Sequence, residues 1–87
     1  MLQITYTDRF KKHYKKLNDQ EKNQFRQKLR LFVANPFHPS LRIKRIQGTD
    51  ELFEFSVSMD IRVIWFYEGK NLVALVDIGH HDVLKNY

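Results

Sequence analysis

The side chains that could move a proton or hold an anion gather in the second half of the chain and in the loop before it. His80 and His81 follow a glycine near the C-terminal end, and Tyr87 is the last residue. Imidazole titrates near neutral pH and serves as a general acid or base, whereas a phenol donates a proton or stacks on a nucleobase. Neighbours on an extended chain point to opposite sides, so we favour His81 as the acid–base group and regard His80 as a nearby substrate contact.

Arg62 is the only charged residue of the apolar run 61–67. Burying a guanidinium is costly unless it is paired, so this side chain needs a partner. The partner is either Glu54, which lies across the predicted hairpin, or an anionic ligand such as a phosphate. The two interpretations are compatible.

Arg42, Lys44 and Arg45 form a basic run in the loop that precedes the hairpin. Alternation places Arg42 and Lys44 on one side of the chain and Arg45 on the other. Residues 1–47 carry twelve lysines and arginines against three acids, a net charge of +9, whereas residues 48–87 have a net charge of −4. This asymmetry favours a polyanionic partner, either nucleic acid or an acidic protein; a merely solvated charged surface is the alternative.

Several classes of protein are disfavoured by composition. The chain has no cysteine, which removes disulfide scaffolds, thiolate zinc sites and cysteine nucleophiles. The run His80-His81-Asp82 lacks further ligands at suitable spacing, so we predict no metal site and no cofactor. The N-terminal residues do not resemble a signal peptide, and no apolar run approaches the ~20 residues that span a bilayer. We therefore expect a soluble cytoplasmic protein.

Hydrophobic periodicity predicts the elements that must position these residues. Leu2 to Tyr6 alternates as a short strand does, and Thr7 or Asp8 can cap the helix that follows. A second helix is expected to begin at Asn18, with Glu21 completing a capping box, and to stop at Asn35-Pro36. Strands are predicted over 53–57, 61–67 and 72–78, with turns at Met59-Asp60 and 68–71 and with Gly79 ending the last strand.

The resulting order is β-α-α-β-β-β in a single domain over residues 1–87. We expect an α+β fold in which an N-terminal helical hairpin packs on a roughly four-stranded, mainly antiparallel twisted sheet. The face of the sheet opposite the helices is the expected place for a ligand.

This order of elements, together with four segments of the sequence, resembles the RelE/ParE toxin superfamily. The segments are "DRFKKHYKKL", "NPFHPSLRIKRIQG", "LFEFSVSMDIRVIWFY" and "LVDIGHHDVLKNY". The resemblance implies a ribosome-dependent, metal-independent endoribonuclease that cleaves mRNA to block translation. The implied catalytic residues are His81, Arg62 and Tyr87. The implied substrate-binding residues are Arg42, Lys44, Arg45, Ser56, Asp60 and His80.

The chain departs from the superfamily's patterns on the first strand of the hairpin. RelE-like members carry lysines where this chain has Glu54 and Ser56. YafQ-like members use histidines with an aspartate in the turn; Asp60 fits that slot, but Ser56 replaces a histidine. Two alternatives therefore stay open: a ParE-like inhibitor of DNA gyrase without nuclease chemistry, and a degenerate member that only binds its antitoxin.

Under each of these alternatives, the resemblance implies a cognate antitoxin as partner. Such segments are usually acidic and fold on binding, which suits the basic half of the chain. The ribosome and mRNA are further partners of the nuclease, and a toxin–antitoxin heterotetramer is the assembly that the resemblance suggests.

Overall fold

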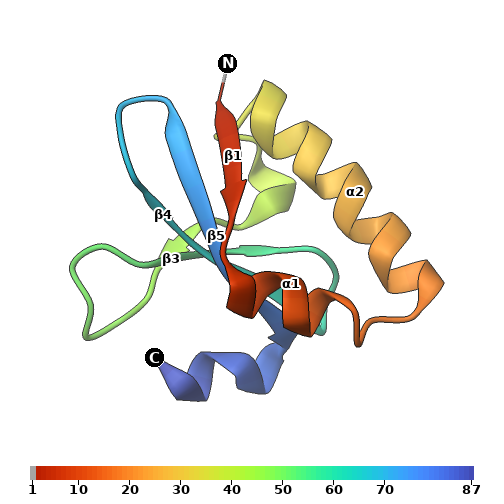
Figure 1. Ribbon diagram of the computed structural model, residues 1–87. Helices are drawn as coiled ribbons and strands as arrows, with labels where there is room; N and C mark the ends of the chain where they lie inside the picture. The colour runs from red at the N-terminus through yellow and green to blue at the C-terminus, as the bar shows by residue number, and fades with distance from the viewer. Residues whose placement is uncertain (1) are drawn as a thin grey trace.

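The computed structural model describes residues 2–87 as two helices and a five-stranded sheet (Figure 1). The chain forms β1 (Gln3–Tyr6), α1 (Asp8–Tyr14), α2 (Asp19–Ala34), the 3-10 helix η1 (Pro39–Leu41), β2 (Lys44–Arg45), β3 (Phe53–Ser56), β4 (Ile61–Tyr67), β5 (Leu72–His80) and the 3-10 helix η2 (His81–Asn86). The predicted order of helices and strands is confirmed. No helix in this part of the chain is long and apolar enough to cross a bilayer.

The sheet has the spatial order β1-β5-β4-β3-β2. β1 runs parallel to β5, and the remaining neighbours are antiparallel. The predicted number of strands was one too low, because Lys44 and Arg45 of the basic loop pair with Glu54 and Phe53 as a two-residue edge strand. A pairing this short leaves no periodic signal in the sequence.

Side-chain caps define both helix starts, as predicted. The Thr7 hydroxyl accepts a hydrogen bond from the Phe10 amide and also contacts carbonyls of β5, which ties the start of α1 to the sheet. Asn18 and Glu21 form a reciprocal capping box at the start of α2. These bonds satisfy amides that the first turn of a helix leaves unpaired.

The main core lies between α2 and one face of the sheet. Phe32 is fully buried, with its ring centroid 4.9 Å from those of both Phe55 and Trp65. Val63 and Trp65 of β4 face this core, so alternation along the strand directs Ile64 between them toward the opposite face of the sheet. There Ile64 packs in a second, smaller cluster with residues of the basic loop and of η2.

The C-terminal end differs from the prediction in two respects. Gly79 does not end the last strand, because Gly79 and His80 stay paired with Arg62 and Ile61 of β4. The residues beyond them form η2, and Val83 packs closely over Gly79. The face expected to be open for a ligand is therefore partly covered by the chain's own tail.

Candidate functional site: a buried carboxylate beneath the C-terminal tail

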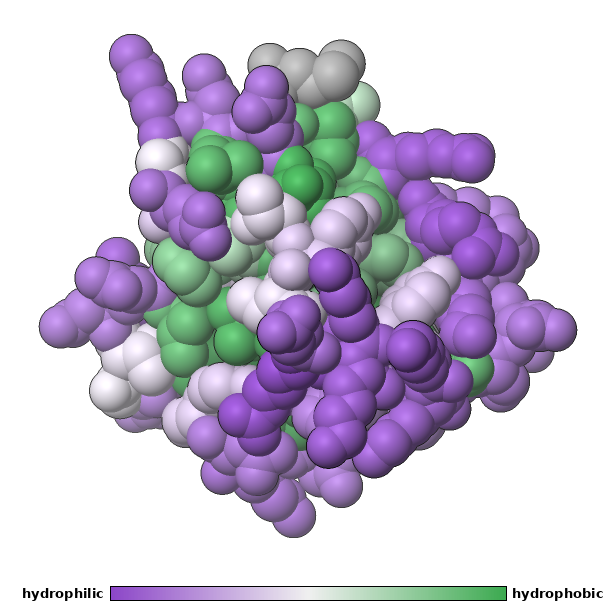
Figure 2. Space-filling model, viewed as in Figure 1, coloured by the Kyte–Doolittle hydropathy of each residue, from purple (hydrophilic) through white to green (hydrophobic). Residues whose placement is uncertain are grey.

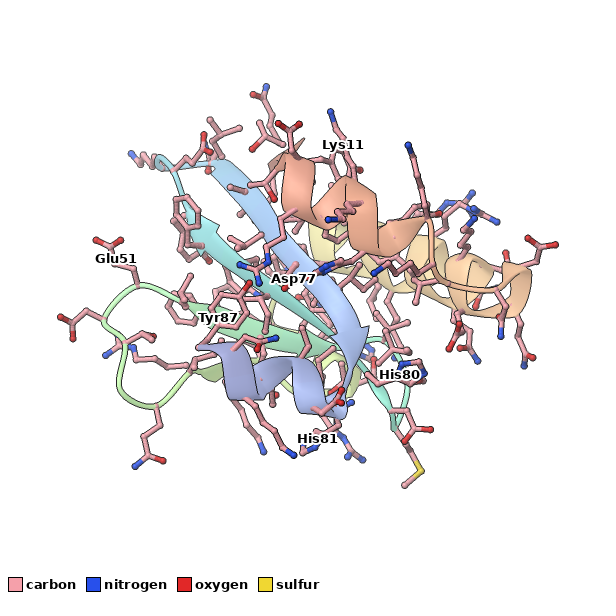
Figure 3. All side chains as sticks on the ribbon, turned by 60° about the horizontal axis from the view of Figure 1, so that its bottom comes forward. Lys11, Glu51, Asp77, His80, His81 and Tyr87 are labelled. Carbon is pink, nitrogen blue, oxygen red and sulfur yellow. The ribbon has the colours of Figure 1, made fainter. Side chains whose placement is uncertain are left out.

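The side chain of Asp77 on β5 is fully buried and is surrounded by donors from three elements (Figure 3). One carboxylate oxygen accepts the Ile78 amide at 2.8 Å and contacts His13 Nδ1 of α1 at 2.5 Å. The other accepts the Tyr87 hydroxyl at 2.8 Å and lies 3.3 Å from Arg9 Nε. A buried carboxylate is tolerated because these partners satisfy both oxygens. The cluster joins α1, β5 and the end of the tail.

Tyr87 is held in this cluster at two points. Its hydroxyl donates to Asp77, and the Arg9 guanidinium carbon lies 5.6 Å from its ring centroid. Burial, the hydrogen bond to Asp77 and the negative charge of that carboxylate raise the pKa of Tyr87 to about 12. A phenol in this arrangement stays protonated at neutral pH and holds the tail against β5.

Arg62 is held by the hairpin on which it lies. Its Nε is 3.6 Å from Glu54 Oε1, which confirms the predicted ion pair across the hairpin. Its Nη1 donates to the carbonyls of Ser58, Met59 and Ile61 at 2.7, 2.9 and 3.2 Å. The guanidinium therefore fastens the β3–β4 turn, and Nη2 takes part in none of these bonds.

The two histidines at the end of β5 have different surroundings. His81 begins η2 and is exposed, and its imidazole forms no side-chain hydrogen bond or ion pair with any of residues 2–87. His80 Nε2 lies 3.3 Å from Glu21 of α2. The imidazole of His81 is thus available to a ligand, whereas that of His80 has a protein partner.

Strand register places several predicted residues side by side. Ser56, Arg62 and Gly79 form one row across β3, β4 and β5. The strand partner of Arg62 is therefore Gly79, which lies two residues before His81 in the chain. Ser56 is buried in this row, and Asp60 is exposed in the adjoining turn. The structure thus brings this row and the turn to the end of β5 at which His81 lies.

The three predicted cations of the basic loop separate in space. Lys44 pairs with Glu54 and Arg45 with Phe53, so they face opposite sides as predicted, and the Arg45 guanidinium lies 5.8 Å from the Phe53 ring centroid. Arg42 lies outside β2. It has a left-handed backbone (φ 50°) at the end of η1, which breaks the alternation.

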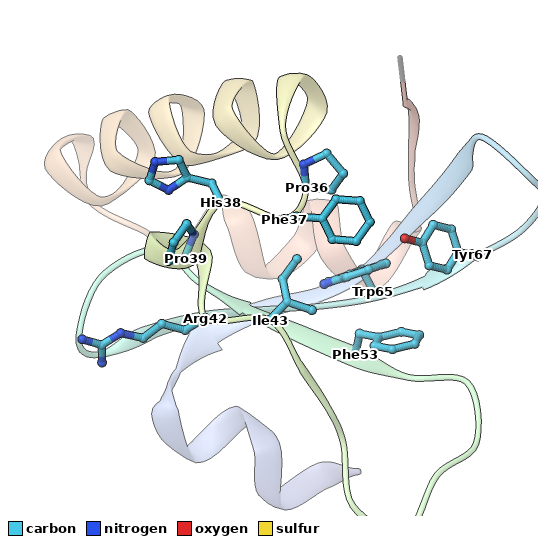
Figure 4. Close-up of a pocket in the computed structure, with 9 residues that line it drawn as sticks. All are labelled: Pro36, Phe37, His38, Pro39, Arg42, Ile43, Phe53, Trp65 and Tyr67. Atoms are coloured by element: carbon cyan, nitrogen blue, oxygen red, sulfur yellow. The ribbon is translucent and has the colours of Figure 1, made fainter.

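Arg42 instead lines an aromatic pocket on the helix side of the sheet (Figure 4). The pocket has a volume of about 450 Å³, and it is framed by Phe37 of the loop and by Trp65 and Tyr67 of β4. Arg42 also lines a smaller hollow with Ser56, Ser58 and Met59 beside the β3–β4 turn, which brings it next to the row that contains Arg62.

A second pocket, which we call the tail pocket, lies between α1, the end of β5 and η2. It has a volume of about 410 Å³. Its lining residues are His13, Lys16, Leu17, Ile78, Gly79, His80, Asp82, Val83, Lys85 and Asn86. His13 thus connects the buried carboxylate of Asp77 to a cationic cavity. No group of three or more potential metal ligands occurs within residues 2–87.

The central residues of this cluster, Asp77, His13 and Arg9, were missed by the sequence prediction. One signal was present: Asp77 is an acid inside the apolar run 72–78, and it requires a partner for the same reason as Arg62. Its partners could not be identified in this way, because His13 lies 64 residues earlier in the chain.

No family model and no curated protein matches this chain. Three similar solved structures cover nearly the whole of it. YafQ from E. coli strain BL21(DE3) is 18% identical, with a TM-score of 0.78 over 97% of this chain and 98% of YafQ. A YoeB/ParE toxin from Agrobacterium tumefaciens is 10% identical, with a TM-score of 0.76 over 92% of this chain and 99% of the toxin.

The third is a chain of the archaeal RelE–RelB complex from Pyrococcus horikoshii OT3. It is 13% identical, with a TM-score of 0.70 over 91% of this chain and 93% of its own. These identities are too low to transfer residue roles, but the shared arrangement extends over almost every element. The protein described here therefore shares its fold with the YafQ, YoeB/ParE and RelE structures, and this is the fold that its sequence predicted.

Proposed function

We propose that this protein is the toxin of a type II toxin–antitoxin system and acts as a metal-independent endoribonuclease that cleaves mRNA on the ribosome. The observation that carries the proposal is the unpaired imidazole of His81, exposed at the end of β5 close to the row that contains Arg62. The fold shared with YafQ, YoeB/ParE and RelE toxins supports the same class.

The residues at this end of β5 suit phosphodiester cleavage. His81 has no protein partner and would exchange a proton with the 2′-hydroxyl or with the leaving 5′-oxygen. The free Nη2 of Arg62 would contact the phosphate, because the other guanidinium nitrogens are held by the hairpin. Ser56 pairs with Arg62, and Asp60 lies in the turn before it. Lys44 lies on β2, the edge strand beside β3.

The antitoxin would occupy a groove of the helical hairpin. The groove has an aromatic floor formed by Phe10, Tyr14 and Phe25, and its remaining lining residues are Tyr6, Lys11, Lys15, Lys22, Arg26 and Leu29. Figure 2 shows apolar surface bordered by hydrophilic side chains on this side of the molecule. An acidic segment with an apolar face matches both features. One similar structure is named as the DinJ–YafQ toxin–antitoxin complex, and another is named as a RelE–RelB complex. A heterotetramer built on this contact is the assembly that we propose.

One observation favours a second function, a ParE-like inhibitor of DNA gyrase. Glu54 lies in the region assigned to the phosphate and already neutralises Arg62. A negative charge there would repel a phosphodiester, whereas binding to a protein target would not require a cationic cleft.

The test is primer extension on a message translated in a reconstituted ribosome system, with wild type, His81→Gln and a control histidine variant, His38→Gln. Both histidines are exposed, so neither substitution should disturb the core. We expect the wild type and His38→Gln to cut the message and His81→Gln to lose at least ~100-fold in rate.

Equal cutting by all three proteins would reject the role of His81. An intact message together with arrested supercoiling by gyrase would reject the nuclease and favour the ParE-like function.

A further inference from the structure

The buried carboxylate of Asp77 has more partners than a structural role requires. The Ile78 amide, the Tyr87 hydroxyl and Arg9 would already satisfy both oxygens. The His13 imidazole is nevertheless held against the same carboxylate from α1. A carboxylate in this position fixes the tautomer and orientation of an imidazole, with Nδ1 carrying the proton that faces the acid.

This arrangement leaves His13 Nε2 as the unused nitrogen of the ring. The side chain of His13 is 28% exposed, and the residue lines the tail pocket. No hydrogen bond from Nε2 to any of residues 2–87 is present. An imidazole that is oriented by a buried acid and opens into a cavity has the geometry of a general acid–base group.

The charges around the tail pocket suit an anion. Lys16 approaches it from the turn after α1 and Lys85 from η2, while Asp82 is the only acid among its lining residues. Arg9 already compensates the negative charge of Asp77, and Tyr87 donates a hydrogen bond to the same carboxylate. The titratable and charged groups that face His13 come from every element around it. They are Arg9 of α1, Lys16 of the turn after α1, Asp77 and His80 of β5, Asp82 and Lys85 of η2, and the last residue, Tyr87.

We infer that the tail pocket is a second RNA-binding site, in which His13 acts as an acid–base residue, Asp77 positions it, and Lys16 and Lys85 hold a phosphodiester. The site is separate from His81, which is not among the residues that line the pocket. The inference rests on the proposed function for the identity of its ligand, RNA.

The chemistry requires no group beyond the chain, the RNA and water. His13 Nε2 accepts the proton of a ribose 2′-hydroxyl, and the 2′-oxygen forms a bond to phosphorus. The bond from phosphorus to the 5′-oxygen then breaks, its electron pair stays on that oxygen, and a water molecule supplies the proton. The products are a 2′,3′-cyclic phosphate and a 5′-hydroxyl, and His13 returns its proton to the solvent.

The first experiment compares the double variant His81→Gln/His13→Asn with His81→Gln and with His81→Gln/His38→Gln in the ribosome assay, so that cleavage at His81 does not mask cleavage in the tail pocket. The asparagine amide can donate to Asp77 in place of Nδ1, so the tail stays clamped, but it lacks a titratable nitrogen that faces the pocket. We expect thermal stability close to that of His81→Gln, and we expect the residual cleavage of His81→Gln to fall at least ~100-fold in the double variant. Unchanged cleavage would overturn the catalytic role of His13, because a purely structural contact survives this substitution.

The second experiment does not depend on cleavage. The proton resonances of the His13 imidazole would be followed by NMR during titration with a short 2′-O-methyl RNA oligonucleotide, which cannot be cut because it has no free 2′-hydroxyl. We expect a saturable shift in the wild type and at least ~10-fold weaker binding by the double variant Lys16→Gln/Lys85→Gln. No shift in the wild type, or equal affinity in the double variant, would overturn the site. If the wild type cuts no message but binds the oligonucleotide in this way, the proposed function fails and the RNA site stands.

Discussion

Removal of one hydroxyl group, in Tyr87→Phe, should destabilise the protein in a pH-dependent way. The hydroxyl donates to the buried carboxylate of Asp77, and the pKa of Tyr87 is raised from 10.0 to about 12. A phenol whose pKa is raised by folding stabilises the protein fully below pH 10, where it is protonated in both states. That stability is lost as the pH rises from 10 through about 12, because the unfolded phenol ionises first.

The magnitude follows from the size of the shift. A shift of two pKa units corresponds to about 2.7 kcal/mol of unfolding free energy if the unfolded phenol has its ordinary pKa. The Tyr87 ring is partly exposed, so solvent screening reduces this to about 1 kcal/mol. Wild type should exceed Tyr87→Phe by this amount at pH 8 and by about half of it at pH 11.

Urea unfolding at the two pH values measures the difference. With a slope of roughly 1–3 kcal/mol/M, the midpoint of Tyr87→Phe at pH 8 should lie ~0.3–1 M below that of wild type. Tyr67→Phe is the control, because the Tyr67 hydroxyl has no hydrogen-bond partner within residues 2–87 and the residue is 46% exposed. Equal midpoints for wild type and Tyr87→Phe at pH 8, or a gap that does not shrink at pH 11, would refute the assigned hydrogen bond.

Three further substitutions test other parts of the structure. Asp77→Asn removes the charge that holds α1, β5 and the tail together; we expect a loss of about 3 kcal/mol in unfolding free energy, seen as a fall of roughly 12–24 °C in Tm. Phe32→Ala empties the centre of the core and should cost about 3–5 kcal/mol in a urea titration. Gly79→Val would collide with Val83, whose Cβ would lie 3.3 Å from the new Cβ; we expect η2 to detach, measured as faster amide hydrogen exchange over residues 81–86, while exchange in α2 stays unchanged.

The fold could be predicted from the sequence where local patterns are strong. The capping residues Thr7 and Asn18 and the continuous apolar run of β4 each have a local signature, and each element appeared where it was expected. The errors lie where long-range pairing decides the structure. β2 exists because Lys44 and Arg45 meet β3, and β5 continues past Gly79 because β4 pairs with it.

The candidate site shows the same division. The ion pair of Arg62 with Glu54 could be predicted because a hairpin places these residues on adjacent strands. The cluster at Asp77 could not, since α1 and the tail reach it from opposite ends of the chain. The side on which Arg42 lies could not be predicted, because its left-handed backbone interrupts an alternation that the sequence alone predicts to continue.

The chemical ends of the cut message test the central claim most directly. A metal-independent nuclease that works through imidazole and guanidinium groups uses the 2′-hydroxyl of the RNA as its nucleophile. Mass spectrometry of the fragments should therefore find a 2′,3′-cyclic phosphate upstream of the cut and a 5′-hydroxyl downstream of it. A 3′-hydroxyl with a 5′-phosphate, or a message left whole by protein that arrests gyrase, would contradict the account.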